Sequence, residues 1–382
     1  MNPKLVLLLV GLSAALPASA HVKWFSKTAN CMTAPITTLE IIALPLFWFI
    51  GAAAVAAMFA TASVDLRWSQ GNHLATRWAA RLNDNAARFI APLLRLGTAV
   101  YFLCVVFYFS ASPIILTAEL KTSAPWVPVV QLAIAATVLW RRGALLSALG
   151  IVVLYAYSAS QYGLFHMLDY PFFLGLAAFL GLDAAFGRKL HAPALGILRV
   201  AVGVSLIWCG VEKWLYPGWT FELLQTDLKV LLTTGFSPDL IIMGAGFVEF
   251  CLAFLLIFGR FSSQVAAAVL LAVMISAIPV VGVIDLIGHL PILVVLVVLA
   301  TTRNPLAGGA PESVESWSAQ QLALTFTVAV PGFIGAYYLS HEIAYGAIGK
   351  MHWTEIGIAA LLVTVLAMRI AHTARDSLAG VR

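Results

Sequence analysis

Long apolar runs separated by short polar segments dominate the chain. Eleven such runs follow the first twenty residues, at 38–60, 89–116, 125–140, 143–160, 167–187, 195–215, 239–259, 262–284, 286–302, 320–340 and 354–372. Most approach the ~20 residues that a helix needs to cross a bilayer. Because a helix satisfies its own backbone hydrogen bonds in lipid, the pattern predicts an all-α polytopic membrane protein with about eleven transmembrane helices.

The first twenty residues have the pattern of a secretory signal peptide. Lys4 precedes the apolar stretch 5–16, and the sequence Ala-Ser-Ala at the end of this segment is typical of a cleavage site. The apolar stretch is about 12 residues long, short of the ~20 of a membrane span; a first membrane helix is the alternative. We therefore expect cleavage after Ala20, a mature chain that starts at His21, and a periplasmic leader over residues 21–37.

The distribution of Lys and Arg predicts the orientation. With the leader outside and eleven spans, fifteen of these residues fall on the inner side and six on the outer side. Basic residues favour cytoplasmic loops, so we expect a bacterial inner-membrane protein with a periplasmic N-terminus and a cytoplasmic C-terminus. A cytoplasmic amphipathic segment at 62–88 and a cytoplasmic linker at 304–319 follow from this topology. Residues 320–382 then form two last helices and a tail.

Composition narrows the class of protein further. Hydrophobic residues make up 62% of the chain and charged residues 10%, against roughly 25% charged residues in soluble proteins. The net charge of +5 is spread over short loops, which argues against a nucleic-acid partner and leaves the lipid bilayer as the expected environment. The four cysteines lack CxxC spacing, so a disulfide framework is not expected. Cys31, alone in an outer loop, is expected to be unreactive.

Two parts of the chain resemble each other. The run that starts at Arg95 is similar to the run that starts at Arg199, and Gln131 aligns with Glu249 when Arg142 is set on Arg260. This internal similarity predicts two parallel four-helix units, at 89–190 and 191–303.

The second unit also resembles a known family. It combines glycines with charged residues in two successive helices, as Arg199, Gly203, Gly210 and Lys213, then Gly246, Glu249, Gly259 and Arg260. This pattern, over residues 195–303, is similar to that of the DoxX family of small four-helix membrane proteins. The resemblance implies a four-helix fold and redox chemistry of sulfur compounds and quinones.

Ionisable residues inside the apolar runs are the first candidates for chemistry, because charge is costly in hydrocarbon. Counted along helices from the nearest inner arginine, Glu212, Glu249 and His289 lie about 16–21 Å up, at a common level. Asp285 lies one helical turn from His289. We therefore interpret Glu212, Glu249, His289 and Asp285 as a proton relay or quinone pocket, with Lys213 and Gln131 as cofactor-binding residues. The alternative is a network of ion pairs that holds the helices together.

A second candidate is a metal site at the new N-terminus. After cleavage, His21 would carry a free amine beside its imidazole, and two nitrogen ligands on one residue favour Cu(II). This arrangement resembles the histidine brace of copper monooxygenases, and His341 or His166 on the outer side could complete it. The alternative is that His21 is simply the first residue of the leader.

These patterns predict a membrane oxidoreductase with a periplasm-facing polar pocket. The expected cofactor is a quinone or copper, and the expected partner is a quinone or another redox membrane protein. Two alternatives stay open: a proton-coupled transporter, in which sites between repeated units near mid-membrane are typical, and a non-catalytic membrane subunit or assembly factor. The sequence does not define the oligomeric state.

Overall fold

The computed structural model describes residues 22–26, 29–70, 77, 81–84, 86–307 and 318–346. Every element named below within these residues is helical. The predicted signal peptide, His21 and the last apolar run at 354–372 lie outside the described residues, so they stay predictions.

The helices coincide with ten of the predicted apolar runs. They are α3 (Pro45–Gln70), α5 (Ile90–Tyr108), α6 (Trp126–Thr137), α7 (Ala144–Tyr162), α9 (Pro171–Phe186), α10 (His191–Leu215), α12 (Pro238–Phe258), α13 (Phe261–Val281), α14 (Val283–Thr301) and α15 (Ala319–Tyr345). Short helices connect them: η1 (Val22–Trp24), α2 (Thr38–Ile42), α8 (Leu164–Met167), η2 (Gly187–Leu190), α11 (Pro217–Gln225), η3 (Lys229–Thr234) and η4 (Pro305–Ala307).

Eight stretches of the described chain are long and apolar enough to cross a membrane. One of them, Pro171–Leu215, contains both α9 and α10, and α6 is apolar but shorter. The chain is therefore an all-helical, multi-pass membrane protein, and the count of eleven spans stays a prediction.

The first long helix extends beyond its predicted end. α3 continues past residue 60 to Gln70 and so takes up the start of the segment predicted as amphipathic. Asp65 explains this extension. Its carboxylate is 5% exposed and accepts hydrogen bonds from the backbone nitrogens of Arg260, at 2.9 Å, and Ser262, at 2.8 Å. The side chain therefore satisfies the free N–H groups at the start of α13.

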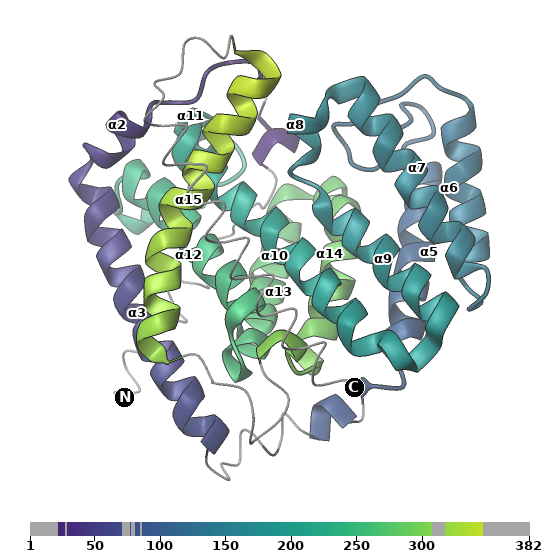
Figure 1. Cartoon of the computed structure of the whole chain (residues 1–382). Helices are drawn as coiled ribbons and strands as arrows, with labels where there is room; N and C mark the ends of the chain where they lie inside the picture. Colours follow the sequence, from purple (N-terminus) through teal and green to yellow (C-terminus); the bar gives the residue numbers. More distant parts are fainter. Residues whose placement is uncertain are drawn as a thin grey trace.

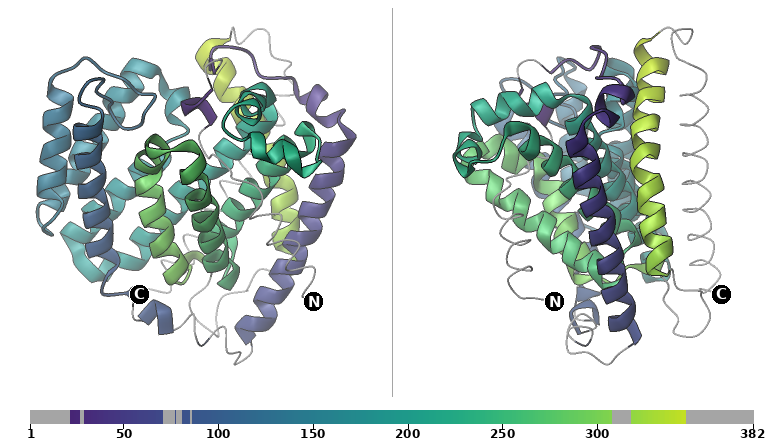
Figure 2. Two further views of the ribbon diagram at one scale, coloured as in Figure 1. Left: turned by 180° about the vertical axis from the view of Figure 1, so that it is seen from behind. Right: turned by 90° about the vertical axis from the view of Figure 1, so that its left-hand side faces the viewer.

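Eight helices form a closed circuit of contacts (Figure 1). α5, α6, α7 and α9 each pack on the next, as do α10, α12, α13 and α14, and the two sets meet where α9 packs on α10 and α14 packs on α5. α3 and α15 pack together and against α12 and α10, at one edge of the bundle (Figure 2). The two sets match the residue ranges of the two predicted units; a duplication stays a prediction.

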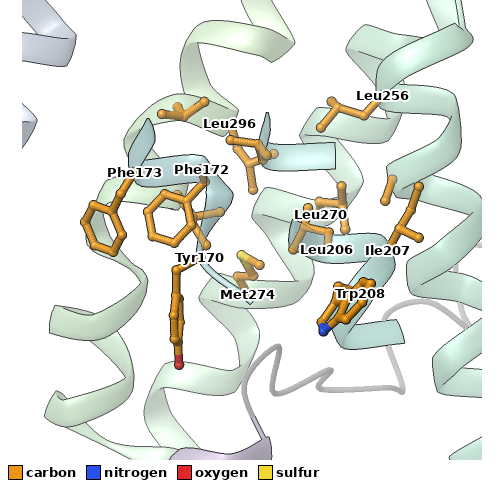
Figure 3. Close-up of a cluster of buried hydrophobic side chains, with 14 of the residues drawn as sticks. Tyr170, Phe172, Phe173, Leu206, Ile207, Trp208, Leu256, Leu270, Met274 and Leu296 are labelled. Atoms are coloured by element: carbon orange, nitrogen blue, oxygen red, sulfur yellow. The ribbon is translucent and has the colours of Figure 1, made fainter. Parts of the chain in front are cut away.

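Large apolar side chains fill the space inside the circuit (Figure 3). Phe172 and Phe173 from α9 lie near Leu296 from α14, and Leu206 from α10 lies near Met274 from α13. These five side chains are at most 4% exposed. The interior is thus a packed core in which burial of polar groups requires partners.

Glycines let α10 approach its neighbours closely. A Cβ atom at Gly210 would lie 3.1 Å from the carbonyl oxygen of Gly246, and one at Gly246 would lie 2.3 Å from the indole nitrogen of Trp214. On the other side of α10, a Cβ at Gly175 of α9 would lie 2.4 Å from that of Ala201. Small residues at such contacts are the usual basis of tight helix packing in membranes.

Buried polar groups also hold the lower end of the bundle in Figure 1, where α9 turns into α10. Asp183 forms an ion pair with Arg95 and lies 2.6 Å from Nε2 of His191. Arg199 is fully buried and donates to the carbonyl oxygens of Leu256, at 3.2 Å, and Thr302, at 3.3 Å. Arg199 therefore satisfies backbone groups at the ends of α12 and α14 instead of lying in a loop.

Candidate functional site

The segment before the first long helix enters the opposite, upper end of the bundle in Figure 1, beside α8. Its residue Lys23 is 8% exposed and places its ammonium nitrogen 2.6 Å from Oδ2 of Asp169. The same nitrogen forms an ion pair with Glu212. Glu212 also accepts a hydrogen bond of 2.9 Å from the hydroxyl of Tyr337 on α15. One lysine from outside the circuit thus bridges carboxylates from both sets of helices.

The next residue, Trp24, occupies a space made by a glycine. A Cβ atom at Gly288 would lie 2.1 Å from the indole ring, so this position of α14 has room for Trp24 because it has no side chain. The ring lies 4.8 Å from that of His289, measured between centroids. The indole N–H donates to the hydroxyl of Tyr170 at 3.0 Å. Trp24 therefore fixes the depth at which Lys23 enters.

A second ion pair joins α10 to α12. Nζ of Lys213 lies 2.5 Å from Oε2 of Glu249, and the side chains are 2% and 3% exposed. Gly210 and Gly246, each three residues before a member of the pair, bring the two helix backbones close together. Lys213 and Glu212 are adjacent in sequence but point to different partners, since successive helical residues are about 100° apart.

The third pair lies within α14. Nδ1 of His289 lies 2.9 Å from Oδ1 of Asp285 and 3.1 Å from the backbone oxygen of the same residue. Both side chains are 2% exposed. The expected placement of these two residues on one helical face is confirmed.

Together these residues form what we call the buried charge cluster, which has more acids than fixed positive charges. It consists of four carboxylates, two ammonium groups and one imidazole, from Asp169, Glu212, Glu249, Asp285, Lys23, Lys213 and His289. Burial raises the pKa of Asp169, Glu212 raises it further and Lys23 lowers it, which leaves a pKa of about 8. The cluster therefore contains at least one carboxyl group able to bind a proton near neutral pH.

The structure brings together most of the residues proposed from the sequence. Glu212, Glu249, His289 and Asp285 are all buried inside the circuit, and Glu212 and His289 both lie within electrostatic reach of Glu249. Gln131 has a different role: its amide donates to the carbonyl oxygens of Ile114, at 2.7 Å, and Ile115, at 2.8 Å. Gln131 thus holds the loop after α5. Its part in cofactor binding stays a prediction.

The two histidines proposed as metal ligands both lie near Cys31. Nδ1 of His166 is 3.5 Å from the sulfur of Cys31, and Nε2 of His341 is 3.1 Å from its backbone oxygen. Within the described residues, no three His, Cys, Asp or Glu side chains are grouped as a metal site would require. His21 lies outside these residues, so its part in a copper site stays a prediction.

Several residues of the cluster escaped the sequence analysis. Lys23 belongs to the predicted leader, Asp169 lies at the start of a predicted span, and Tyr337, which donates to Glu212, lies inside another. When the apolar runs contain more carboxylates than lysines, further positive or hydrogen-bonding groups must pair with those carboxylates. The sequence pattern does not identify which residues these are. Their pairing depends on contacts between residues 146 positions apart in the case of Lys23 and Asp169.

Residues 194–283 match the DoxX family model. The predicted resemblance is thereby confirmed over α10 to α13, whereas α14 begins at Val283, where the match ends. No curated protein and no solved structure matches the chain. The DoxX region contributes Glu212, Lys213 and Glu249 to the buried charge cluster; the other members lie outside it.

Proposed function

We propose that this integral membrane protein exchanges protons through the buried charge cluster, as part of quinone-linked redox chemistry. The observation that carries the proposal is the placement of one ammonium group, Lys23, between two buried carboxylates, Asp169 and Glu212. Two like charges at one buried site favour protonation of one of them. The group that holds the proton then changes its charge when a partner molecule is oxidised or reduced nearby.

The contacts of Asp169 support a proton at this position. Its Oδ1 atom has no hydrogen-bond donor among the described residues, although the residue is 1% exposed. A buried carboxylate oxygen without a donor is costly when charged. Protonation of Asp169 removes that cost and leaves Lys23 paired with Glu212.

Infrared difference spectroscopy tests the proton directly. The reconstituted protein would be titrated from pH 6 to pH 10, and the C=O band of protonated carboxyl groups followed. We expect a band that disappears with a midpoint near the pKa of about 8 and is absent from Asp169→Asn. Glu40→Gln, which changes a fully exposed carboxylate on α2, should leave the band unchanged. A band unaffected by both Asp169→Asn and Glu212→Gln would contradict the proposal.

The link to quinones rests on the DoxX resemblance, which implies redox chemistry of this kind. Reduction of a quinone takes up protons together with electrons, so a buried acid near the bound ring would supply them. We expect Glu249→Gln to lower either the stoichiometry of bound short-chain quinone or the rate of its reduction, relative to Glu40→Gln. If neither quantity changes while the infrared band is present, the cluster exchanges protons without a quinone.

A proton-coupled transporter is the second candidate, favoured by where the cluster lies. Asp169 precedes α9 of the first set of helices and Glu212 belongs to α10 of the second, so Lys23 bridges the junction between them. Transport sites commonly lie at such junctions. Substrate uptake by proteoliposomes that depends on a pH gradient would favour this candidate, whereas silent cluster variants and a co-purifying partner would favour a non-catalytic subunit.

A further inference from the structure

Cys31 lies beside an imidazole and a carboxylate at the rim of the bundle. Its sulfur is 3.5 Å from Nδ1 of His166 on α8, and the other ring nitrogen of His166 is 3.0 Å from Oε1 of Glu119, in the loop after α5. The thiol is half-buried, and the His166 and Glu119 side chains are 13% and 14% exposed. Three separate segments therefore place a nucleophile, a base and a group that orients the base in one line, which is the general arrangement of an activated nucleophile.

Both ring nitrogens of His166 face partners, the sulfur of Cys31 on one side and the carboxylate of Glu119 on the other. Glu119 is itself held by a hydrogen bond from the hydroxyl of Tyr170. A positive imidazole next to a sulfur atom stabilises negative charge on that sulfur.

Other titratable groups around Cys31 are mostly positive or neutral at pH 7. Lys23, Tyr216 and Tyr345 lie within electrostatic reach of the thiol. His341 contacts the backbone oxygen of Cys31 and not its sulfur. The carboxylate of Glu119 lies across the ring of His166 from the sulfur.

We propose that Cys31 is a nucleophilic thiol that exchanges with small disulfides, with His166 as its base and Glu119 as the residue that positions His166. The Cys31 proton passes to His166, and the thiolate attacks one sulfur of the disulfide. A new S–S bond forms as the original one breaks, and the leaving sulfur takes the bonding electron pair and then a proton from His166. The number of disulfide bonds is unchanged, so no further oxidant is required.

Aromatic side chains around His341, which contacts the backbone of Cys31, indicate the kind of substituent that the disulfide carries. The ring of Phe165 lies 5.3 Å from that of His341 and 5.5 Å from that of Tyr345, between centroids. Trp208, whose ring is 6.3 Å from Phe165, has a buried indole N–H with no acceptor in the described part of the chain. This wall suits a disulfide with an apolar or aromatic group and a hydrogen-bond acceptor.

The test measures thiol reactivity in the Cys104→Ser, Cys209→Ser and Cys251→Ser background, where Cys31 is the remaining cysteine. The detergent-purified protein reacts with 4,4′-dithiodipyridine at pH 6, and release of 4-thiopyridone is followed against N-acetylcysteine. An ordinary thiol with a pKa of ~8.5 is about 0.3% thiolate at pH 6. We expect Cys31 to react at least about tenfold faster than this reference. An equal or slower rate overturns the proposal.

Variants then assign the roles. His166→Gln should return the rate to that of the reference, and Glu119→Gln should lower it several-fold and shift its pH profile, while His341→Gln should leave it nearly unchanged. Cys31 reactivity that is insensitive to both His166→Gln and Glu119→Gln, in protein that elutes as the folded species, contradicts the proposal. Stoichiometric copper whose removal by a chelator exposes the thiol would instead assign these residues to a metal site. None of these outcomes depends on the infrared titration of Asp169.

Discussion

Breaking the Lys213–Glu249 pair should have a large effect that is largely reversed when both partners are replaced. The two charged atoms are 2.5 Å apart and the side chains are 2% and 3% exposed, so loss of one partner leaves a buried, uncompensated charge. Such changes cost about 3–5 kcal/mol, whereas replacing both partners with residues of similar volume is often neutral. We therefore expect Lys213→Met and Glu249→Gln each to lower the free energy of unfolding by about 3–5 kcal/mol. The double variant should recover most of that loss.

Equilibrium unfolding in detergent micelles, driven by increasing SDS, measures these differences. Lys121→Met removes an exposed lysine and should change the free energy by no more than about 0.5 kcal/mol. The penalty of Lys213→Met should also shrink at low pH, because the remaining carboxylate can then bind a proton. The reasoning fails if both single variants are as stable as the parent, or if the double variant is less stable than either.

The same variants separate two roles of the pair. A purely structural pair predicts that the double variant regains both its stability and every activity. A pair that takes part in proton exchange predicts regained stability together with an altered carboxyl titration in the infrared. The interpretation of the cluster as a network that holds helices together is thus tested independently of the proposed function.

Three other outcomes follow from the structure. Gly288→Val should displace Trp24, because a Cβ atom at this position would lie 2.1 Å from the ring. The displaced segment should be cleaved faster by a protease near Lys23 in the folded protein. An unchanged cleavage rate would argue against the docked position of Trp24. Stability should fall as pH rises from about 5 to 8, because the raised pKa of Asp169, about 8, means that the folded state binds more protons than the unfolded state. The slope from this group is about 1.4 kcal/mol per pH unit, and Asp169→Asn should flatten it. Protein with a confirmed His21 terminus should bind stoichiometric Cu(II) with a nitrogen-ligand EPR signal if the predicted copper site exists, and metal analysis that finds none would remove that prediction.

The long helices could be predicted from the sequence because apolar runs near the length of a membrane span leave few alternatives. The same reasoning identified Glu212, Glu249 and His289, since charged residues in such runs must face the protein interior. It also placed Asp285 beside His289, because residues four apart share a helical face. These inferences depend on local periodicity alone.

The pairing of the charges could not be predicted in the same way. Lys213 contacts Glu249, and Glu212 is paired with Lys23, which precedes the first long helix. Gln131 was aligned with Glu249, yet it binds backbone oxygens of its own unit. Contacts of this kind depend on how separate helices approach one another, and a sequence without related sequences carries no direct signal of that approach.

Cys31 shows the same limit for chemistry. Nothing near it in sequence suggests a base, and a single thiol in a loop is ordinarily unreactive. His166 lies 135 positions away and Glu119 belongs to another loop. A sequence pattern would have found this constellation only if all three residues had been on one element.

The docking of Lys23 and Trp24 makes the order of synthesis matter for this protein. The segment that contains Lys23 and Trp24 is translated before its partner Gly288 on α14. The contact between the nearby Cys31 and His341 likewise forms only after another 310 residues have been translated. Until α14 has left the ribosome, Trp24 lacks its site at Gly288, so Lys23 is not yet held beside Glu212. A nascent or prematurely terminated polypeptide should therefore be a substrate for membrane proteases, because its acidic residues are unpaired inside the membrane. In the finished chain these residues are paired and buried.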